Sequence, residues 1–457
     1  MSRLQRFAST CAALAIGALL ACAPAPPPRP HVVLLIADDL GWNDVGFHGS
    51  EIGTPNLDAL AREGVVLDRF YVLPACTSTR GALLTGRYPI RYGLQASSVQ
   101  PHATFGLDAA ERTLPEALRE AGYRTALVGK WHLGHARPEL LPLARGFDHH
   151  YGHYNDQIGY FTHLRNGGLD WQRNGEVVRE EGYATTLLGA EAARIVRAHD
   201  PATPLFLQVA FLAAHTPLEV PPDYLAGYAD VERRGRRTFA AMVTAMDDAV
   251  GEIAAALEEA GMADDTLLLF TSDNGANESF GGDNGPLRGG KYRVYEGGVR
   301  VPAFVRWPAA LEGGRHYAHP LHVVDLYPTL VELAGGSLDQ ALPLDGVDVA
   351  PALTRDEPLP PRDLLVNASP AMAALRSGDW KLVVKHGPRR RRGGEPTVEL
   401  FDLARDPGET RDLAAERPEV AARLRAVLQR YEDAAVPPLK PGPVPKDFRA
   451  PAVWGAF

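Results

Sequence analysis

The sequence is poor in cysteine, in long apolar runs and in excess charge of one sign. Its 457 residues include only Cys11, Cys22 and Cys76, which are too few for a disulfide framework. The longest N-terminal apolar run, Cys11 to Ala21, is too short to span a bilayer, and no later segment resembles a membrane helix. The formal charge is 47 − 56 = −9, whereas nucleic-acid binders normally carry a basic face. We therefore expect no nucleic-acid partner.

The rest of the composition is that of a globular protein. Apolar residues make up 45% and charged residues 23%, which excludes a disordered, collagen-like or coiled-coil chain. The length predicts two or three domains with a substantial core. We find no internal repeat, and the 45 Gly and 38 Pro indicate many tight turns.

The N-terminus predicts export. Two arginines precede the first apolar run, which has the length of a signal-peptide core. The run ends in Leu-Leu-Ala-Cys22, which resembles a bacterial lipobox, so residues 1–22 are expected to be a lipoprotein signal peptide; plain signal cleavage is the alternative. Residues 23–30 form a Pro-rich linker. The prediction is a periplasmic or outer-membrane-attached lipoprotein, held to the membrane by a lipid anchor on Cys22.

The body of the chain predicts an α/β fold. Residues 31–37 and 266–271 are continuous apolar runs of the kind found in buried parallel strands. Residues 125–129 and 205–211 are further strand candidates, whereas residues 114–121 and 242–257 have helical features. Strands that alternate with helices indicate a doubly wound, mostly parallel sheet. We expect the catalytic domain to cover residues 31–355.

The pattern changes after about residue 355. Residues 375–385 and 398–403 predict short antiparallel strands, and residues 420–431 predict an amphipathic helix. Residues 356–457 are therefore expected to form a smaller C-terminal α+β domain. Four arginines at 389–392 lie in a predicted hairpin tip. They could attract a polyanionic chain, and the alternative is an ordinary solvated loop.

Acidic and amide side chains follow two of the predicted strands. Asp38 and Asp39 come directly after residue 37, and Asp273 and Asn274 follow the strand that begins at residue 266. Ligand sites in such sheets lie at the carboxyl ends of strands, and hard oxygen ligands suit Ca²⁺ or Mg²⁺. The alternative is that each acidic pair caps a neighbouring helix or turn.

Basic residues predict an anion-binding function. Lys130 and His132 follow a strand candidate, and alternation along an extended chain places them on the same face. Lys supplies a point charge, and His transfers protons near neutral pH. His215 and Lys291 repeat this chemistry elsewhere in the chain. Each of these residues taken alone is equally compatible with an ordinary surface position.

The segment that begins at Cys76 identifies the family. Cys76 and Arg80 are four residues apart and share a face if a helix begins here, where the helix N-terminus favours anions. With these residues the chain resembles the type I sulfatases, and most closely their arylsulfatase B (N-acetylgalactosamine-4-sulfatase) branch. The resemblance runs from about residue 31 to 435. Its blocks are DDLGWNDVGFHGS (38–50), CTSTRGALLTGRYPIRYGLQ (76–95), VGKWHLG (128–134), RGFD (145–148), SDNG (272–275) and PLRGGKYRVYEGGVR (286–300).

The resemblance implies an alkaline-phosphatase-like fold and hydrolysis of sulfate monoesters, either of carbohydrates or of aryl alcohols. It implies that a formylglycine-generating enzyme oxidises Cys76 to formylglycine. The implied ligands of Ca²⁺, with Mg²⁺ as the alternative, are Asp38, Asp39, Asp273, Asn274 and the modified Cys76. Arg80 would hold the formylglycine, and the sulfate-binding and proton-moving residues would be Lys130, His132, His215 and Lys291.

The implied reaction begins with attack on sulfur by one hydroxyl of the aldehyde hydrate. His215 and Lys291 would assist the departing alcohol, and His132 would then help to release sulfate. One residue departs from the family motif, because Ser78 stands where the family has proline. This change puts the efficiency of Cys76 modification in question. The alternatives are a phosphoester or phosphonate monoester hydrolase of the same superfamily, or an inactive lipid-anchored protein that binds sulfated glycans.

Overall fold

The computed structural model describes residues 29–96, 98–387 and 395–457. The predicted signal peptide, most of the linker and the arginines at 389–392 lie outside the described residues. Within the described ranges, no helix combines the length and the apolar character needed to cross a membrane.

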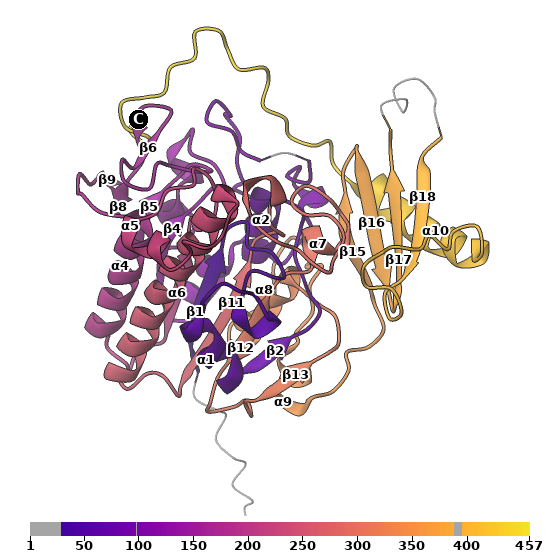
Figure 1. Ribbon diagram of the computed structural model, residues 1–457, viewed down its shortest axis with the longest axis horizontal. Coiled ribbons are helices and arrows are strands. Elements are labelled where there is room, and N and C mark those ends of the chain that lie inside the picture. Colours follow the sequence, from indigo (N-terminus) through magenta and orange to yellow (C-terminus); the bar gives the residue numbers. More distant parts are fainter. Residues whose placement is uncertain (1–28, 97, 388–394) are drawn as a thin grey trace, which may run out of the picture.

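A ten-stranded sheet forms the centre of the described chain (Figure 1), in the order β13-β2-β12-β11-β1-β10-β4-β5-β8-β9. Its strands are β1 (His31–Ala37), β2 (Val65–Leu67), β4 (Arg124–Lys130), β5 (His149–His153), β8 (Gln172–Arg173), β9 (Glu176–Val177), β10 (Leu205–Ala210), β11 (Thr266–Ser272), β12 (Ala303–Arg306) and β13 (Arg315–Tyr317). The central strands β11, β1, β10, β4 and β5 are parallel. Antiparallel strands β12 and β8 flank them. The carboxyl ends of the five parallel strands therefore lie at the same edge of the sheet.

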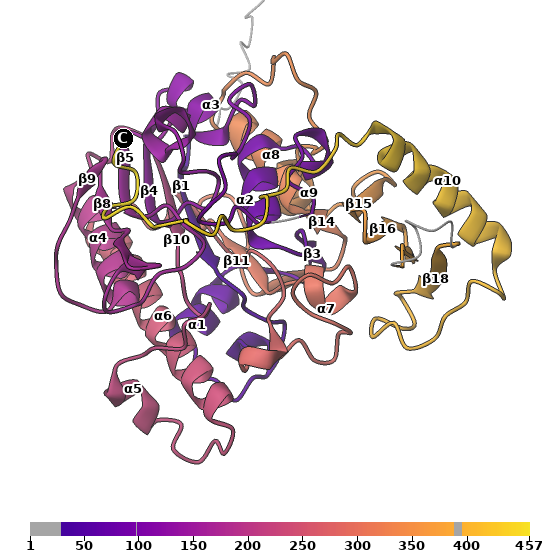
Figure 2. The same cartoon turned by 90° about the horizontal axis from the view of Figure 1, so that it is seen from above.

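Helices cover both faces of this sheet, as the two views show (Figures 1 and 2). The α-helices are α1 (Pro55–Glu63), α2 (Cys76–Thr85), α3 (Leu114–Glu120), α4 (Ala184–Ala198), α5 (Pro222–Ala226), α6 (Arg234–Glu259), α7 (Glu296–Val299), α8 (Leu326–Leu333), α9 (Ala350–Arg355) and α10 (Pro418–Ala434). Short 3-10 helices span Gly46–His48, Pro89–Arg91, Pro138–Leu140, Pro142–Arg145, Glu278–Phe280 and Val323–Asp325. Alternate residues of β1 enter two cores: Val33 and Leu35 join α4 and α6, and Val32 and Leu34 join α2, α3 and α8.

A second, smaller sheet lies beside the first (Figure 1). It is antiparallel, in the order β15 (Asp363–Ala368), β16 (Met372–Ser377), β17 (Trp380–Lys385) and β18 (Thr397–Asp402), and α10 packs against it. Two-stranded pairs are formed by β3 (Phe70–Tyr71) with β14 (Leu321–His322) and by β6 (Leu164–Arg165) with β7 (Gly168–Leu169). The chain after α10 returns across the large sheet (Figure 2), where the Trp454 amide donates to the Leu169 carbonyl at 2.9 Å.

The observed architecture confirms the predicted fold class, a mostly parallel mixed sheet flanked by helices with a small C-terminal α+β unit. The four predicted central strands all form, with ends within one residue of expectation. The predicted helix at 242–257 is the second half of α6, which begins at Arg234. The domain boundary at residue 355 stays a prediction.

Candidate active site

The acidic residues meet because of the strand register. Ala37 at the end of β1 pairs with Ser272 at the end of β11, so Asp38 and Asp273 follow on neighbouring strands. The Asp273 amide donates to the Ala37 carbonyl at 3.0 Å, and the Asp39 amide donates to Asp273 Oδ1 at 3.3 Å. Asp39 has φ +60°, a left-handed conformation that turns the chain sharply after the strand. Asp38, Asp39, Asp273 and Asn274 are all buried at the carboxyl edge of the sheet.

A basic side chain contacts each of the three carboxylates. Lys130 Nζ lies 2.5 Å from Asp38 Oδ2, Lys291 Nζ lies 2.6 Å from Asp39 Oδ1, and Arg80 Nη2 lies 2.8 Å from Asp273 Oδ2. Burial acts to lower the pKa of Lys291, but the charges around it, with Asp39 foremost, raise that pKa well above its usual value. Burial acts to raise the pKa of Asp39, but Lys291 and His215 outweigh it and lower that pKa. Lys291 and Asp39 are therefore both ionised at neutral pH and form a buried ion pair.

Glycine at position 129 allows Lys130 to reach this cluster. Gly129 has φ +109°, and a Cβ added there would lie 2.0 Å from the Ala210 carbonyl oxygen of the neighbouring strand. Only glycine permits this conformation and this approach. The next residue, Lys130, ends β4 with its side chain fully buried against Asp38.

Cys76 is the first residue of α2 and lies beside the charged cluster. Arg80, one turn later on the same helix, binds Asp273 through Nε at 3.0 Å as well as through Nη2. The Cys76 thiol is buried, with Ser98 Oγ 3.8 Å from its sulfur. Burial raises the pKa of the thiol despite the nearby charges of Lys130 and Lys291. An unmodified Cys76 is therefore protonated at neutral pH, which makes it a weak nucleophile.

His132 also reaches the site, but by a different route from the one expected. The strand ends at Lys130, and His132 has φ +59°, so alternation along an extended chain was the wrong argument. His132 Nε2 lies 3.1 Å from the Val99 carbonyl, which can only accept, so the proton is on Nε2. The other nitrogen, Nδ1, is buried with no hydrogen-bond partner in the described chain. Burial and the charges of Lys130 and Arg80 hold the pKa of His132 well below its usual value, so Nδ1 is a free proton acceptor.

His215 approaches from the segment that follows β10. Its Nδ1 lies 2.8 Å from the Thr216 carbonyl and therefore carries the proton. Its Nε2 faces Asp39 Oδ2 at 3.8 Å. The Tyr160 hydroxyl donates to the His215 carbonyl at 2.9 Å and fixes the backbone there. His215 thus presents Nε2 to the acidic cluster.

The donor set fits a hard divalent cation. Asp38 Oδ1 and Asn274 Oδ1 are buried and have no hydrogen-bond partner among the described residues. The Asn274 amide nitrogen donates to Asp39 Oδ1 at 2.7 Å, which orients its oxygen away from that bond. Asp38, Asp39 and His215 offer ligand atoms that all lie within 4.8 Å of one another. Orphaned buried oxygens of this kind are costly unless a cation or a proton satisfies them.

The structure adds two residues, Thr77 and Ser98, that the sequence analysis did not single out, and it shows the contact made by Ser78. Thr77 Oγ1 lies 3.2 Å from His132 Nε2 and steadies the ring, and Ser98 is the polar neighbour of the thiol. Ser78 donates its hydroxyl to the Leu94 carbonyl at 2.6 Å within the first turn of α2. Thr77 lies inside the matched motif and offered a signal, whereas Ser98 offered none. Every predicted site residue, Asp38, Asp39, Cys76, Arg80, Lys130, His132, His215, Asp273, Asn274 and Lys291, belongs to this one region.

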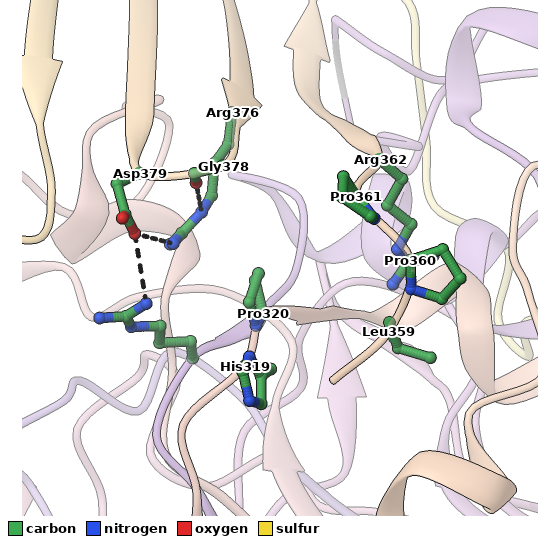
Figure 3. A pocket seen from close by; sticks show the side chains of 10 residues that line it. His319, Pro320, Leu359, Pro360, Pro361, Arg362, Arg376, Gly378 and Asp379 are labelled. Carbon is green, nitrogen blue, oxygen red and sulfur yellow. Dashed lines mark hydrogen bonds and ion pairs between the residues drawn. The ribbon is translucent and has the colours of Figure 1, made fainter. Parts of the chain in front are cut away.

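A separate cavity of about 210 Å³ lies beside the turn between β16 and β17 of the small sheet (Figure 3). Arg376 and Asp379 stand on one side, and Pro360, Pro361 and Arg362 on the other. Its guanidinium groups are already paired, since Arg362 binds Asp325 and Arg376 contacts Asp379. None of the predicted site residues lines this cavity.

Comparison with known proteins gives consistent matches. A family model described as Sulfatase matches residues 30–337. Mouse arylsulfatase J is 34% identical over 94% of this chain and 80% of its own length. Human N-acetylgalactosamine-6-sulfatase is 32% identical over 90% of this chain and 87% of its own length. The crystal structure of Ps i-CgsB in complex with k-i-k-neocarrahexaose has a TM-score of 0.82 at 32% identity, covering 90% of this chain and 94% of that one.

Proposed function

The chain belongs to the sulfatase family and is a sulfuric ester hydrolase, and from that premise we propose that it removes sulfate from carbohydrates by means of a formylglycine at residue 76 and a bound divalent cation. The observation that carries the proposal is the buried cluster in which Cys76 lies among three carboxylates and three fixed cations. The arylsulfatase B branch stays a prediction. So does Ca²⁺ as the ion, with Mg²⁺ as the alternative.

The charge of the cluster suits an anionic ester. Asp38, Asp39 and Asp273 contribute −3, and the three basic residues contribute +3, so their sum is zero. A bound dication brings the site to +2, in surroundings where electrostatic attraction is stronger than in water. Sulfate oxygens carry negative charge that repels a nucleophile, and fixed positive groups offset that repulsion.

The cation and the formylglycine would have defined tasks. When present, the cation polarises the sulfate oxygens, and the hydrated formylglycine supplies the attacking hydroxyl. The ligands would be Asp38 Oδ1, Asn274 Oδ1 and oxygens of Asp39 and Asp273, together with residue 76. Arg80 orients Asp273 and the first turn of α2, while Lys130 and Lys291 bind sulfate oxygens.

The two histidines are suited to the two proton transfers. His132 presents the buried, unprotonated Nδ1, which would accept a proton from the hydroxyl that remains on residue 76 when sulfate leaves. His215 and Lys291 border the more open side of the cluster, with side chains 12% and 3% exposed. There the Lys291 ammonium and a proton on His215 Nε2 would assist the departing alcohol by proton donation.

The proposed substrate is a sulfated carbohydrate. One relative carries N-acetylgalactosamine-6-sulfatase as its name, and one similar solved structure holds k-i-k-neocarrahexaose. Both support a sugar as the alcohol component. The sequence resemblance favours a 4-sulfated galactosamine. Comparing the release of sulfate from N-acetylgalactosamine 4-sulfate and from its 6-sulfate isomer shows which position is hydrolysed.

Maturation and location complete the proposal. A formylglycine-generating enzyme would convert Cys76, with Ser78 in the position of the motif proline. The exported chain would be attached to a bacterial membrane by lipid on Cys22. Replacing each of these two cysteines with alanine gives a matched pair of variants, one for the nucleophile and one for the anchor.

Hydrolysis of paired aryl sulfate and aryl phosphate esters by the purified full chain tests the function. We expect preference for the sulfate, complete loss in Cys76→Ala with unchanged thermal unfolding, and full turnover in Cys22→Ala. Prolonged EDTA treatment should abolish turnover, and Ca²⁺ or Mg²⁺ should restore it. Preference for the phosphate ester, or retained turnover in Cys76→Ala, would contradict the proposal. Membrane partitioning of Cys22→Ala tests the anchor: unchanged partitioning would discard it.

A further inference from the structure

An aromatic ring stands exposed at the edge of the catalytic cluster. Tyr292 is 59% exposed although it directly follows Lys291, whose side chain is almost fully buried against Asp39. Lys291 Nζ lies 5.4 Å from the centre of the Tyr292 ring. The ring is therefore next to the ammonium group that the proposed function assigns to the sulfate oxygens.

The backbone holds this ring in place. Tyr292 has φ +67°, a left-handed conformation that is rare for a bulky side chain. Its amide donates to the Pro74 carbonyl at 2.7 Å, two residues before Cys76. The Lys291 amide donates to the Ala276 carbonyl at 3.1 Å, and the Arg293 amide to the Gly290 carbonyl at 2.9 Å. Tyr292 is thus anchored on both sides, with its backbone tied to the segment that carries the nucleophile.

The environment of the ring is specific. Partial burial and the charges at Cys76, Asp39 and Asp38 raise the pKa of Tyr292, whereas the charge of Lys291 lowers it. The Tyr292 hydroxyl is therefore close enough to the cluster to interact electrostatically with it. An aromatic face left in water beside an anion-binding site has unsatisfied apolar surface. A sugar ring can cover this aromatic face, because the C–H face of the sugar is apolar and its ester oxygen connects it directly to sulfur.

We propose that Tyr292 is the stacking platform for the pyranose ring that bears the sulfate ester, and so determines specificity for sulfated pyranosides. This inference rests on the proposed function. The ring would contact the sugar, while Lys291 and Lys130 hold the sulfate. Because the ring would contact the sugar and not the sulfate, its removal should weaken binding of the sugar without changing the affinity for inorganic sulfate.

The test compares Tyr292→Ala, Tyr292→Phe and a matched control, Phe457→Ala, which removes another exposed ring (68%) at the end of the chain. Substrates are N-acetylgalactosamine 6-sulfate and its 4-sulfate isomer. For the better substrate we expect Tyr292→Ala to lower kcat/KM about 10-fold, mainly through KM. Inhibition by inorganic sulfate should stay unchanged, and Tyr292→Phe and Phe457→Ala should resemble the parent. Unchanged kcat/KM in Tyr292→Ala would overturn the platform, and a Tyr292→Phe loss as large as that of Tyr292→Ala would assign the effect to the hydroxyl instead.

A binding measurement separates this inference from the proposed function. Titration calorimetry of the same sugar sulfates into Cys76→Ala, with and without Tyr292→Ala, requires no turnover. Weaker binding in the double variant together with an inactive parent would support the platform and reject the sulfatase mechanism. Equal binding to Cys76→Ala and to the double variant, together with an active parent enzyme, would reject the platform but not the proposed function. Absence of binding to both variants would also overturn the platform.

Discussion

Replacing Arg80 with lysine tests whether the cluster needs a guanidinium fork or only a positive charge. Arg80 makes two bonds to Asp273 Oδ2, from Nε at 3.0 Å and from Nη2 at 2.8 Å, and a third from Nη1 to the Lys130 carbonyl at 3.1 Å. A single ammonium nitrogen keeps the charge but cannot reproduce this geometry. We expect it to retain one of the three bonds.

The expected loss follows from the bonds removed. Hydrogen bonds that involve charged groups contribute about 1.5–3 kcal/mol each, so losing two lowers the free energy of unfolding by about 3 kcal/mol or more. Asp273 also loses its fixed orientation, and disturbing the partner of a metal ligand weakens metal affinity by roughly 10–100-fold. The concentration of Ca²⁺ or Mg²⁺ that restores half of the turnover to EDTA-treated enzyme should rise by that factor.

Arg87→Lys is the matched control. Arg87 is also buried, but its ion pair with Glu111 joins Nε to Oε2 at 3.3 Å and lies outside the catalytic cluster. Lysine can preserve a single charge contact of this kind, so we expect a smaller loss of stability and an unchanged metal requirement. Denaturant unfolding and metal titration of turnover measure both quantities. Parental stability and metal requirement in Arg80→Lys would refute the reasoning.

Three further outcomes follow from the structure. His132→Ala removes the free proton acceptor at Nδ1, so about one equivalent of alcohol should be released per active site before turnover slows by roughly 10²–10⁴-fold; stopped-flow detection of the alcohol shows whether this burst occurs. Ser78→Pro places proline in the first turn of α2, where it is tolerated, and removes the bond to Leu94; we expect a larger fraction of converted residue 76 with a stability loss of about 1 kcal/mol, read by mass spectrometry and thermal unfolding. Burial lowers the pKa of His150 and of His322 to about 3 in the folded protein, whereas both histidines protonate near pH 6.5 in the unfolded chain. Protonation below pH 6.5 therefore stabilises the unfolded chain, and the free energy of unfolding falls as the pH is lowered from 6.5 toward 3. From pH 7 to 5 the loss is about 2 kcal/mol for each, and urea unfolding of a His150→Leu, His322→Asn protein should depend less on pH than that of the parent.

The sequence predicted the acidic part of the candidate site because strand ends are readable locally. The apolar runs at 31–37 and 266–271 are long enough to identify two buried strands, and parallel pairing then brings Asp38 and Asp273 together. Helical spacing placed Cys76 and Arg80 on one face of a helix, whereas their place beside the acidic residues was implied by the resemblance to the type I sulfatases. These predictions depend on short-range patterns that tertiary contacts did not override.

Other parts depend on contacts that no local pattern reveals. His132 reaches the site through a left-handed residue, which an alternation rule cannot anticipate. Ser98 meets Cys76 across 22 residues of chain, and Trp454 pairs with Leu169 across a far longer separation. The last two strands at one end of the large sheet, β8 and β9, have two residues each, too few to show a period. The first strand of the small sheet, β15, was also missed, since its sequence DLLVNA does not alternate.

The central claim is that residue 76, once converted, is the nucleophile of this cluster. Trypsin should release it in the peptide 70–80, FYVLPACTSTR, and mass spectrometry of that peptide gives the fraction in which CH₂SH has become CHO. Preparations made with and without a formylglycine-generating enzyme will differ in this fraction. Turnover of an aryl sulfate per enzyme molecule should rise in proportion to it and extrapolate to zero at zero conversion; equal turnover by fully unconverted protein would contradict the account.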